Sequence, residues 1–163
     1  MVHIAFLALG SNQGEKIKHC ESAVEALLQL DATALLARSS WYRTDPWGNE
    51  EQDWFINGVI QLATPLKPHE LLHRGKEIER ALGREDYGQW GPRTIDIDIL
   101  FHDDLVIKTP DFEIPHPRMH LRNFVLIPMA EIAPHFVHPV FKRDIEQLLD
   151  AVADQKKVVR VPG

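Results

Sequence analysis

The stretch TIDIDILF, residues 94–101, alternates apolar side chains with acidic ones at a period of two. Successive side chains of a β-strand point to opposite faces of a sheet. The pattern therefore predicts a strand with Ile95, Ile97 and Ile99 on one face and Asp96 and Asp98 on the other. The isoleucine face is the one that helices should cover, which fixes the register and leaves both carboxylates on the open face.

The N-terminal segment predicts a strand followed by a helix. Residues 2–9, VHIAFLAL, form an unbroken apolar run, and the turn sequence GSNQG at 10–14 ends it. Apolar residues then recur at helical spacing to about Leu30, with Ser11 or Asn12 as the expected N-cap.

Two further strands and a second helix lie between this unit and the TIDIDILF strand. Residues 35–44 and 54–62 are rich in strand formers and predict an antiparallel pair. Their connection at 45–53 is longer than most hairpin loops, which is typical of a functional loop. Pro68 suits the first position of a helix that should end at Gly83.

The resulting order βαββαβ predicts an α+β, ferredoxin-like core with an antiparallel-rich sheet and both helices on one face. Beyond this core, residues 106–114 predict a small hairpin, 123–132 a short apolar helix and 145–152 an amphipathic helix. No repeat or long linker divides the 163 residues, so a single domain over residues 1–163 is expected.

Composition narrows the classes of function. Eighteen basic and 24 acidic side chains give a net charge of −6, which argues against a nucleic-acid surface or an anionic-membrane binder. The first apolar run is too short for a signal or membrane segment, so a cytoplasmic location is expected. The single cysteine, Cys20, predicts a buried, inert thiol in a reducing compartment.

The acidic pair carries the most chemical information. In a strand, the Cα atoms of Asp96 and Asp98 lie roughly 6 to 7 Å apart on one face. Carboxylates at this spacing suit Mg²⁺ and can hold two ions about 3.5 to 4 Å apart that also take phosphate oxygens. An isolated D-x-D motif is more often surface charge. Guanidinium groups accompany this D-x-D motif, as a metal-nucleotide site requires. These groups belong to Arg84, Arg93, Arg118 and Arg122.

Two common nucleotide-binding motifs are absent from the sequence. Neither the G-x-x-x-x-G-K-[ST] motif nor the G-x-G-x-x-G fingerprint occurs. Two alternatives stay open: a non-catalytic ferredoxin-like ligand-binding module, and a hydrolase with zinc or manganese held by acids and histidines. The hydrolase would use Asp96, Asp98, His116 and His120, although Pro117 denies the two histidines a helical context.

Five segments together resemble one enzyme family. They are ALGSN at 8–12, YRT at 42–44, FIN at 55–57, WGPRTIDIDIL at 90–100 and PHPRM at 115–119. In this order, over about 130 residues, they resemble 6-hydroxymethyl-7,8-dihydropterin pyrophosphokinase of folate biosynthesis. The resemblance implies a ferredoxin-like fold and a reaction in which the pterin hydroxymethyl oxygen attacks the β-phosphorus of ATP and AMP leaves. A monomer is expected.

The resemblance also implies roles for individual residues. Asp96 and Asp98 would hold two Mg²⁺ ions with ATP, and Arg84 and Arg93 would be further catalytic residues. The implied ATP-binding residues are Leu72, Lys76, Glu79, Trp90, Arg93, Ile99, His116, Arg118 and Arg122, although Glu79 could equally be a solvated helix residue. The implied pterin-binding residues are Gly10, Thr44, Asp45, Trp47, Phe55, Asn57 and Phe124, with the ring between the two phenylalanines.

One loop departs from the family pattern. Asp86 and Gln89 stand where the family usually carries basic residues. Because such residues would reach ATP phosphates, we expect weaker ATP binding, or compensation by Lys76, Arg118 or His120.

Overall fold

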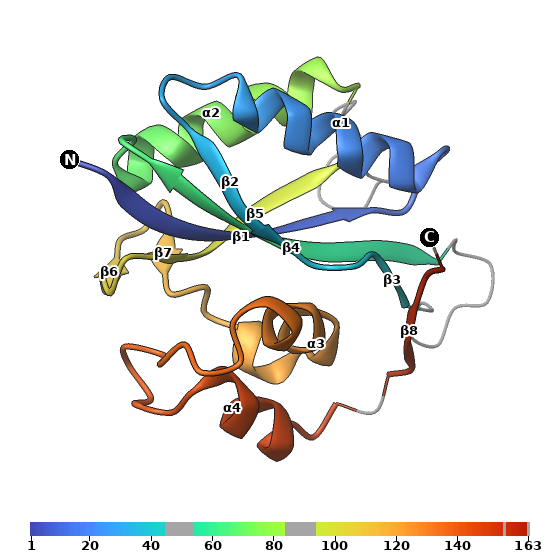
Figure 1. The fold of residues 1–163 in the computed structure, drawn as a ribbon, viewed down its shortest axis with the longest axis vertical. Helices are drawn as coiled ribbons and strands as arrows, with labels where there is room; N and C mark the ends of the chain where they lie inside the picture. The colour runs from blue at the N-terminus through green and yellow to red at the C-terminus, as the bar shows by residue number, and fades with distance from the viewer. Residues whose placement is uncertain (45–53, 84–93, 155, 163) are drawn as a thin grey trace.

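The computed structural model describes residues 1–44, 54–83, 94–154 and 156–162. Six strands of this part form one sheet in the order β5-β1-β4-β3-β8, with β2 also paired to β4 (Figure 1). Every neighbouring pair is antiparallel. The strands are β1 (His3–Ser11), β2 (Ala34–Arg38), β3 (Tyr42–Thr44), β4 (Phe55–Thr64), β5 (Asp96–His102) and β8 (Val158–Arg160).

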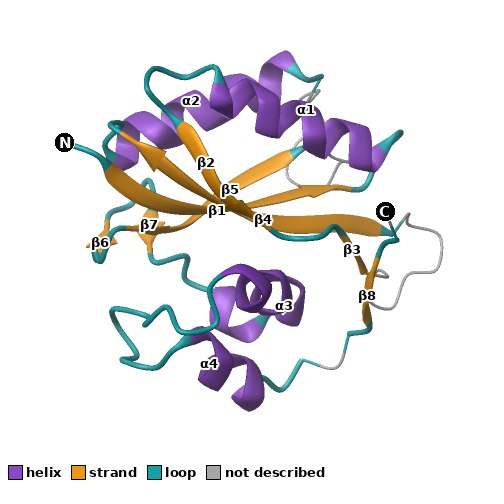
Figure 2. Cartoon of the chain, in the orientation of Figure 1, coloured by secondary structure: helices purple, strands orange, loops and turns teal. Residues whose placement is uncertain are grey.

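Helices cover both faces of the sheet (Figure 2). On one face lie α1 (Lys16–Leu28) and α2 (Pro68–Ala81), and on the other lie α3 (Asn123–Ile132) and α4 (Ile145–Ala151). A 3₁₀ turn at Met119–Leu121 precedes α3, and β6 (Ile107–Lys108) pairs with β7 (Glu113–Ile114) as a separate antiparallel hairpin. The acid-bearing face of the sheet is therefore only partly open, because α3 and α4 cover the rest of it.

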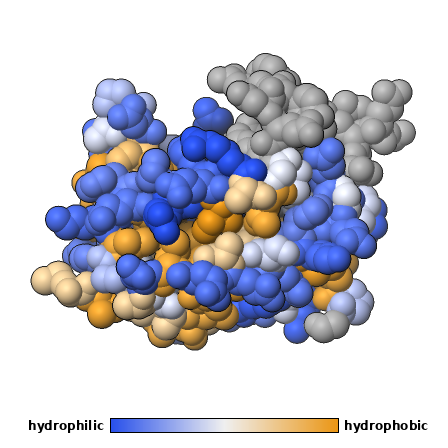
Figure 3. Space-filling view, turned by 90° about the horizontal axis from the view of Figure 1, so that it is seen from above, coloured by the Kyte–Doolittle hydropathy of each residue, from blue (hydrophilic) through white to orange (hydrophobic). Residues whose placement is uncertain are grey.

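Two apolar cores result from this layering. Ile95, Ile97 and Ile99 lie in the core under α1 and α2, as the alternation predicts. Phe6 and Leu100 lie in a second core against α3 and α4. Hydrophilic side chains dominate the outer surface above α1 and α2, where apolar groups are exposed only in smaller patches (Figure 3).

The first βα unit differs in detail from the prediction. Strand β1 continues to Ser11, which pairs with Ile56, because β1 is central and bonded on both sides. Gly14 then adopts a φ of +65°, and α1 begins after Glu15, which makes no side-chain cap hydrogen bond. The expected N-cap at Ser11 or Asn12 is therefore wrong.

The segment predicted as one strand at 35–44 forms two. Ser39 lies in the break, where its backbone N–H donates to the Val59 carbonyl and its hydroxyl accepts from the Val59 N–H. The shorter strand, β3, gains an unpredicted partner in β8, where Thr44 opposes Val158. The long connection at 45–53 lies outside the described residues.

Three other predicted features, in α2, α3 and at Cys20, are present. Helix α2 has Pro68 in its first turn, and Gly83 follows its end with a φ of +96°. Helix α3 spans the predicted residues. Cys20 is fully buried, and burial raises the pKa of its thiol to about 12, so the thiol is inert. Among the described residues, no helix is both long and apolar enough to span a membrane.

Candidate active site

Three central strands bring the predicted residues onto one face. Gly10 in β1 opposes Asn57 in β4 on one side and Asp96 in β5 on the other. One step along the same face, Ala8 opposes Asp98. Directly opposed residues of antiparallel strands share a face. Because Gly10 and Ala8 have minimal side chains, the sheet is hollow between the carboxylates of β5 and the amide of β4.

The hollow needs glycine at position 10. A Cβ built on Gly10 would lie 2.7 Å from Asn57 Oδ1, inside van der Waals contact. The amide of Asn57 therefore lies directly against the backbone of β1.

This hollow is the floor of a cavity of about 280 Å³. Its walls combine two carboxylates, three basic side chains and two phenylalanine rings. The lining residues are Ala8, Leu9, Gly10, Thr44, Phe55, Asn57, Gly58, Asp96, Asp98, Leu100, His116, Arg122, Phe124, Val125 and Lys156.

Most predicted site residues in the described part of the chain converge here. The cavity is lined by Gly10, Thr44, Phe55, Asn57, Phe124, Asp96, Asp98, His116 and Arg122. The other described candidates, Leu72, Lys76, Glu79, Ile99 and Arg118, do not line it. The remaining candidates, Asp45, Trp47, Arg84, Trp90 and Arg93, lie outside the described residues, as do Asp86 and Gln89.

Glu79 is buried rather than solvated. Its side chain is 4% exposed, and Glu79 Oε2 accepts a hydrogen bond of 3.0 Å from the Ile97 backbone N–H. Ile97 lies between Asp96 and Asp98, so this contact fixes the strand segment that carries both carboxylates. The alternative of a solvated helix residue is wrong. Ile99 likewise packs in the core under the helices.

His116 enters the cavity as a neutral hydrogen-bond donor. Burial and the charges of Arg122 and Arg118 lower its pKa from 6.5 to about 4. Its Nδ1 accepts a hydrogen bond of 3.1 Å from the Arg118 backbone N–H, so the ring proton is on Nε2. A further bond, from the His116 N–H to the Leu100 carbonyl, holds this loop against β5.

The lowered pKa of His116 predicts a loss of stability in mild acid. His116 takes up a proton near pH 6.5 in the unfolded chain but only near pH 4 in the folded chain. The contribution of His116 to the free energy of unfolding should therefore level off above about pH 6.5 and fall as the pH drops toward 4. His138 acts in the same direction, since burial also lowers its pKa to about 4.

Urea unfolding at pH 7.5, 6.5, 5.5 and 5.0 measures this effect. The double variant His116→Gln with His138→Gln should show a shallower decline than the unmodified chain over this range. Carboxylates with a lowered pKa, such as Asp103 and Glu131, titrate mainly below this pH range and so contribute little to the slope. Equal slopes for the two proteins would contradict the prediction.

Arg122 and Asp98 both line the cavity, and the negative charge of Asp98 acts on the Arg122 guanidinium. Burial and Arg118 lower the pKa of the Arg122 guanidinium, while Asp98 and Asp154 oppose this shift. Arg122 Cζ also lies 5.6 Å from the centre of the Phe124 ring. A cationic group thus stands next to both the carboxylate strand and the aromatic wall.

The Thr44 wall is held by an exposed acid on α3. Glu131 accepts hydrogen bonds from the Ser40 N–H, the Ser40 hydroxyl and, at 2.6 Å, the Tyr42 hydroxyl. Burial and this bond raise the pKa of Tyr42 to about 12, so the phenol stays a donor. Strand β3 is thereby fixed to α3. Thr44, two residues on, is 3% exposed, and its hydroxyl has no hydrogen-bond partner within the described chain.

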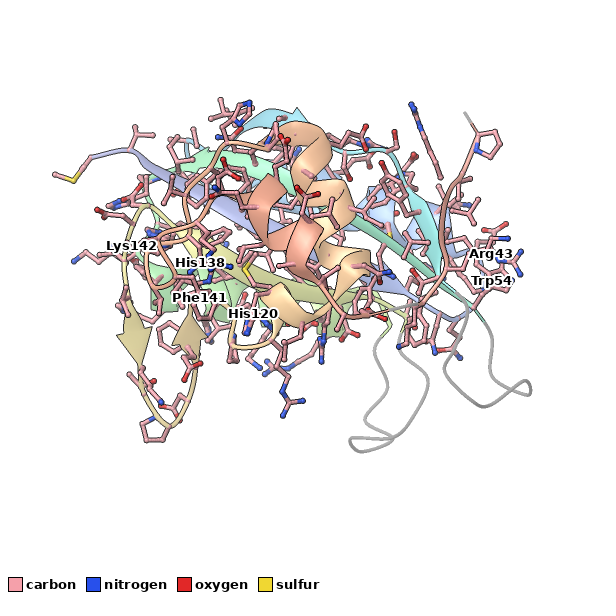
Figure 4. The ribbon with its side chains drawn as sticks, turned by 90° about the horizontal axis from the view of Figure 1, so that it is seen from below. Arg43, Trp54, His120, His138, Phe141 and Lys142 are labelled. Carbon is pink, nitrogen blue, oxygen red and sulfur yellow. The ribbon has the colours of Figure 1, made fainter. Side chains whose placement is uncertain are left out.

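The hydrolase alternative fails on the position of His120. Its ring packs at a tilt against Phe141, with centroids 4.6 Å apart, in a cluster with His138. This cluster lies apart from Arg43 and Trp54 beside β3 and β4 (Figure 4). Among the described residues, the one group of three or more potential metal ligands is His3, His102 and Asp103. His120 does not line the cavity of Asp96 and Asp98.

A cavity that pairs carboxylates with basic and aromatic side chains, on a mixed α/β fold, has the make-up of a phosphotransferase site. The 7,8-dihydro-6-hydroxymethylpterin-pyrophosphokinase (HPPK) family matches residues 6–134, and the chain belongs to this family.

Relatives of the chain include two bacterial proteins named 2-amino-4-hydroxy-6-hydroxymethyldihydropteridine pyrophosphokinase. The one from Methylorubrum extorquens is 45% identical over 133 residues, which cover 82% of this chain and 84% of the relative. The one from Bacillus subtilis is 46% identical over 132 residues, covering 81% and 79%.

The fold is shared with a solved structure at low identity. The crystal structure of wild-type Plasmodium falciparum HPPK-DHPS with pteroate matches with a TM-score of 0.75 at 17% identity. The match covers 92% of this chain but only 42% of the Plasmodium chain, so this chain spans less than half of that protein.

Family membership confirms the resemblance that the sequence motifs indicate. The chain is an enzyme of the pyrophosphokinase class, a transferase of folate biosynthesis, and the non-catalytic binding module is excluded.

Proposed function

We propose that this enzyme transfers the β,γ-pyrophosphoryl group of ATP to 6-hydroxymethyl-7,8-dihydropterin with the help of Mg²⁺. The hydroxymethyl oxygen forms a bond to the β-phosphorus, the bond from that phosphorus to the α,β-bridging oxygen breaks, and AMP leaves. The hydroxyl proton passes to water. The products are AMP and the pterin pyrophosphate ester.

One observation supports this proposal above the others. A single cavity holds both Asp96 and Asp98 together with His116 and Arg122, and the same cavity carries Asn57 and two phenylalanines. The acids and bases suit a metal-bound polyphosphate. The amide and rings suit a flat heterocycle with a donor and acceptor edge.

The residues fit magnesium. Asp96 and Asp98 supply hard oxygen ligands from one strand face over the small-residue floor, and their strand is fixed by Glu79. They would hold two ions. When bound, Mg²⁺ neutralises phosphate charge and lowers the pKa of the attacking hydroxyl.

The chain's own groups then position both substrates. His116 donates its Nε2–H and Arg122 its guanidinium N–H groups to phosphate oxygens, which stabilises the charge of the transferring group. Phe55 and Phe124 stack on the two faces of the pterin, and the Asn57 amide forms hydrogen bonds with the polar edge of the ring. Bringing the hydroxyl to the phosphorus in a fixed geometry supplies much of the rate enhancement.

The proposal extends to the other residues that the resemblance implies. Arg84, Trp90, Arg93, Leu72, Lys76, Glu79, Ile99 and Arg118 complete the ATP site, and Asp45 and Trp47 the pterin site. We also infer a ferredoxin-like plan, because the strand order is β5-β1-β4-β2. We further infer that the chain is a single domain, a monomer and cytoplasmic.

Chromatography of the nucleotide products tests the reaction. The protein, Mg·ATP and 6-hydroxymethyl-7,8-dihydropterin should yield AMP, and omission of either Mg²⁺ or the pterin should abolish it. Formation of ADP would instead mean attack on the γ-phosphorus. Absence of any nucleotide turnover would overturn the proposal.

A further inference from the structure

Lys156 lines the cavity although it lies far along the chain from every other lining residue. It stands in the segment between α4 and β8, just before the strand that pairs with β3. No periodicity or motif in the sequence marks it.

The backbone of Lys156 is fixed to the start of α3. The Asn123 side-chain amide donates to the Lys156 carbonyl at 2.6 Å, and the Lys156 N–H donates to Asp154 Oδ1 at 2.9 Å. Asp154 Oδ2 in turn accepts from the Asn123 backbone N–H at 3.2 Å. This closed set of bonds places Lys156 beside Phe124, the residue after Asn123.

The ammonium group of Lys156 lies over an aromatic ring. Lys156 Nζ is 5.7 Å from the centre of the Phe124 ring, which also has the Arg122 guanidinium against it. Within the described part of the chain, Lys156 forms no ion pair with a carboxylate. A half-buried cation is thus held at the cavity by a weak contact with a ring.

The proposed substrates change the surroundings of this ammonium. A pterin stacked on Phe124 would compete for contact with the ring near which Lys156 and Arg122 both lie. The bound polyphosphate at the same time brings several negative charges into the cavity. A flexible lysine side chain can exchange the weak contact with the ring for a stronger charge-assisted hydrogen bond.

We propose that Lys156 binds the pyrophosphoryl group as it passes from ATP to the pterin, as a second cation beside Arg122. This inference rests on the proposed function. The C-terminal segment would thereby contribute directly to substrate binding, and not only close the edge of the sheet. Lys156 would stabilise the ternary complex and leave binding of the pterin alone unaffected.

Lys156→Met tests this role because it keeps the length of the side chain and removes the charge. Lys157→Met is the matched control, since Lys157 is the exposed neighbour and does not line the cavity. We expect Lys156→Met to lower kcat/KM for Mg·ATP about tenfold or more, the usual effect of losing a hydrogen bond to a charged group. Lys156→Arg should recover most of the loss, and Lys157→Met should stay within about twofold of the unmodified enzyme.

Two binding measurements distinguish phosphate contact from a structural role. Affinity for the dihydropterin alone, followed by fluorescence, should stay within about twofold in Lys156→Met, while affinity for Mg·α,β-methylene-ATP in the presence of pterin should fall about as much as kcat/KM. Equal loss of both affinities, or unchanged turnover, would overturn the inference. If the unmodified enzyme forms no AMP yet binds the ATP analogue in a Lys156-dependent way, the proposed function fails, and the contact of Lys156 with the polyphosphate alone stands.

Discussion

Asp98→Asn and Asp96→Asn are each expected to reduce AMP formation about a thousandfold or more. The substitution keeps the size of the side chain but replaces a charged ligand by a neutral amide with one acceptor oxygen. Loss of one metal-holding carboxylate removes several kcal/mol of stabilisation from the developing phosphate charge, and about 4 kcal/mol corresponds to a thousandfold change in rate. Initial rates at saturating Mg·ATP and pterin measure the effect.

Asp104→Asn provides the control for a carboxylate of the same type. Asp104 is exposed in the turn that follows β5 and does not line the cavity. The Asp104→Asn variant should therefore keep full activity. Both active-site variants should unfold at the same temperature as the unmodified chain, because Asp98 is exposed and Asp96 only half-buried. Substantial AMP formation by Asp98→Asn would show that the pair does not hold the catalytic metal.

The carboxylate strand was predictable because one short pattern fixes both faces at once. The isoleucines at 95, 97 and 99 can be buried together only if Asp96 and Asp98 point the other way, and a slip of one residue would bury both charges. Helix α3 was equally clear, because a short apolar segment without strand alternation needs a sheet face to cover it.

Features set by distant contacts were not predictable. Strand β8 has three residues, and its pairing of Arg160 with Tyr42 depends on how α3 and α4 return the chain to the sheet. Lys156 reaches the cavity for the same reason. The burial of Glu79 depends on a hydrogen bond to a strand that lies beyond the next loop. Helical spacing places Glu79 on a face of α2 but says nothing of what covers that face.

Gly58→Ala is expected to destabilise the fold by about 3 kcal/mol, at the upper end of the usual cost of overpacking. A Cβ at Gly58 would lie 2.5 Å from Trp41 Cε3 and 2.6 Å from Trp41 Cζ3. Trp41 is 8% exposed and belongs to the core under α1, so its rigid ring has little room to move away. Thermal unfolding should shift downward by roughly 6 to 12 °C.

Gly75→Ala, the matched substitution in α2, should have the opposite effect. A Cβ there would lie 3.5 Å from Ile97 Cγ2, an ordinary contact, and alanine favours a helix over glycine by about 1 kcal/mol. Gly58 also adjoins Asn57 on β4, so any displacement of the strand by Trp41 would move the amide that we assign to the pterin edge. Gly58→Ala should therefore raise the KM for the pterin more than that for ATP. Unchanged stability would mean that the Trp41 ring is not held against β4.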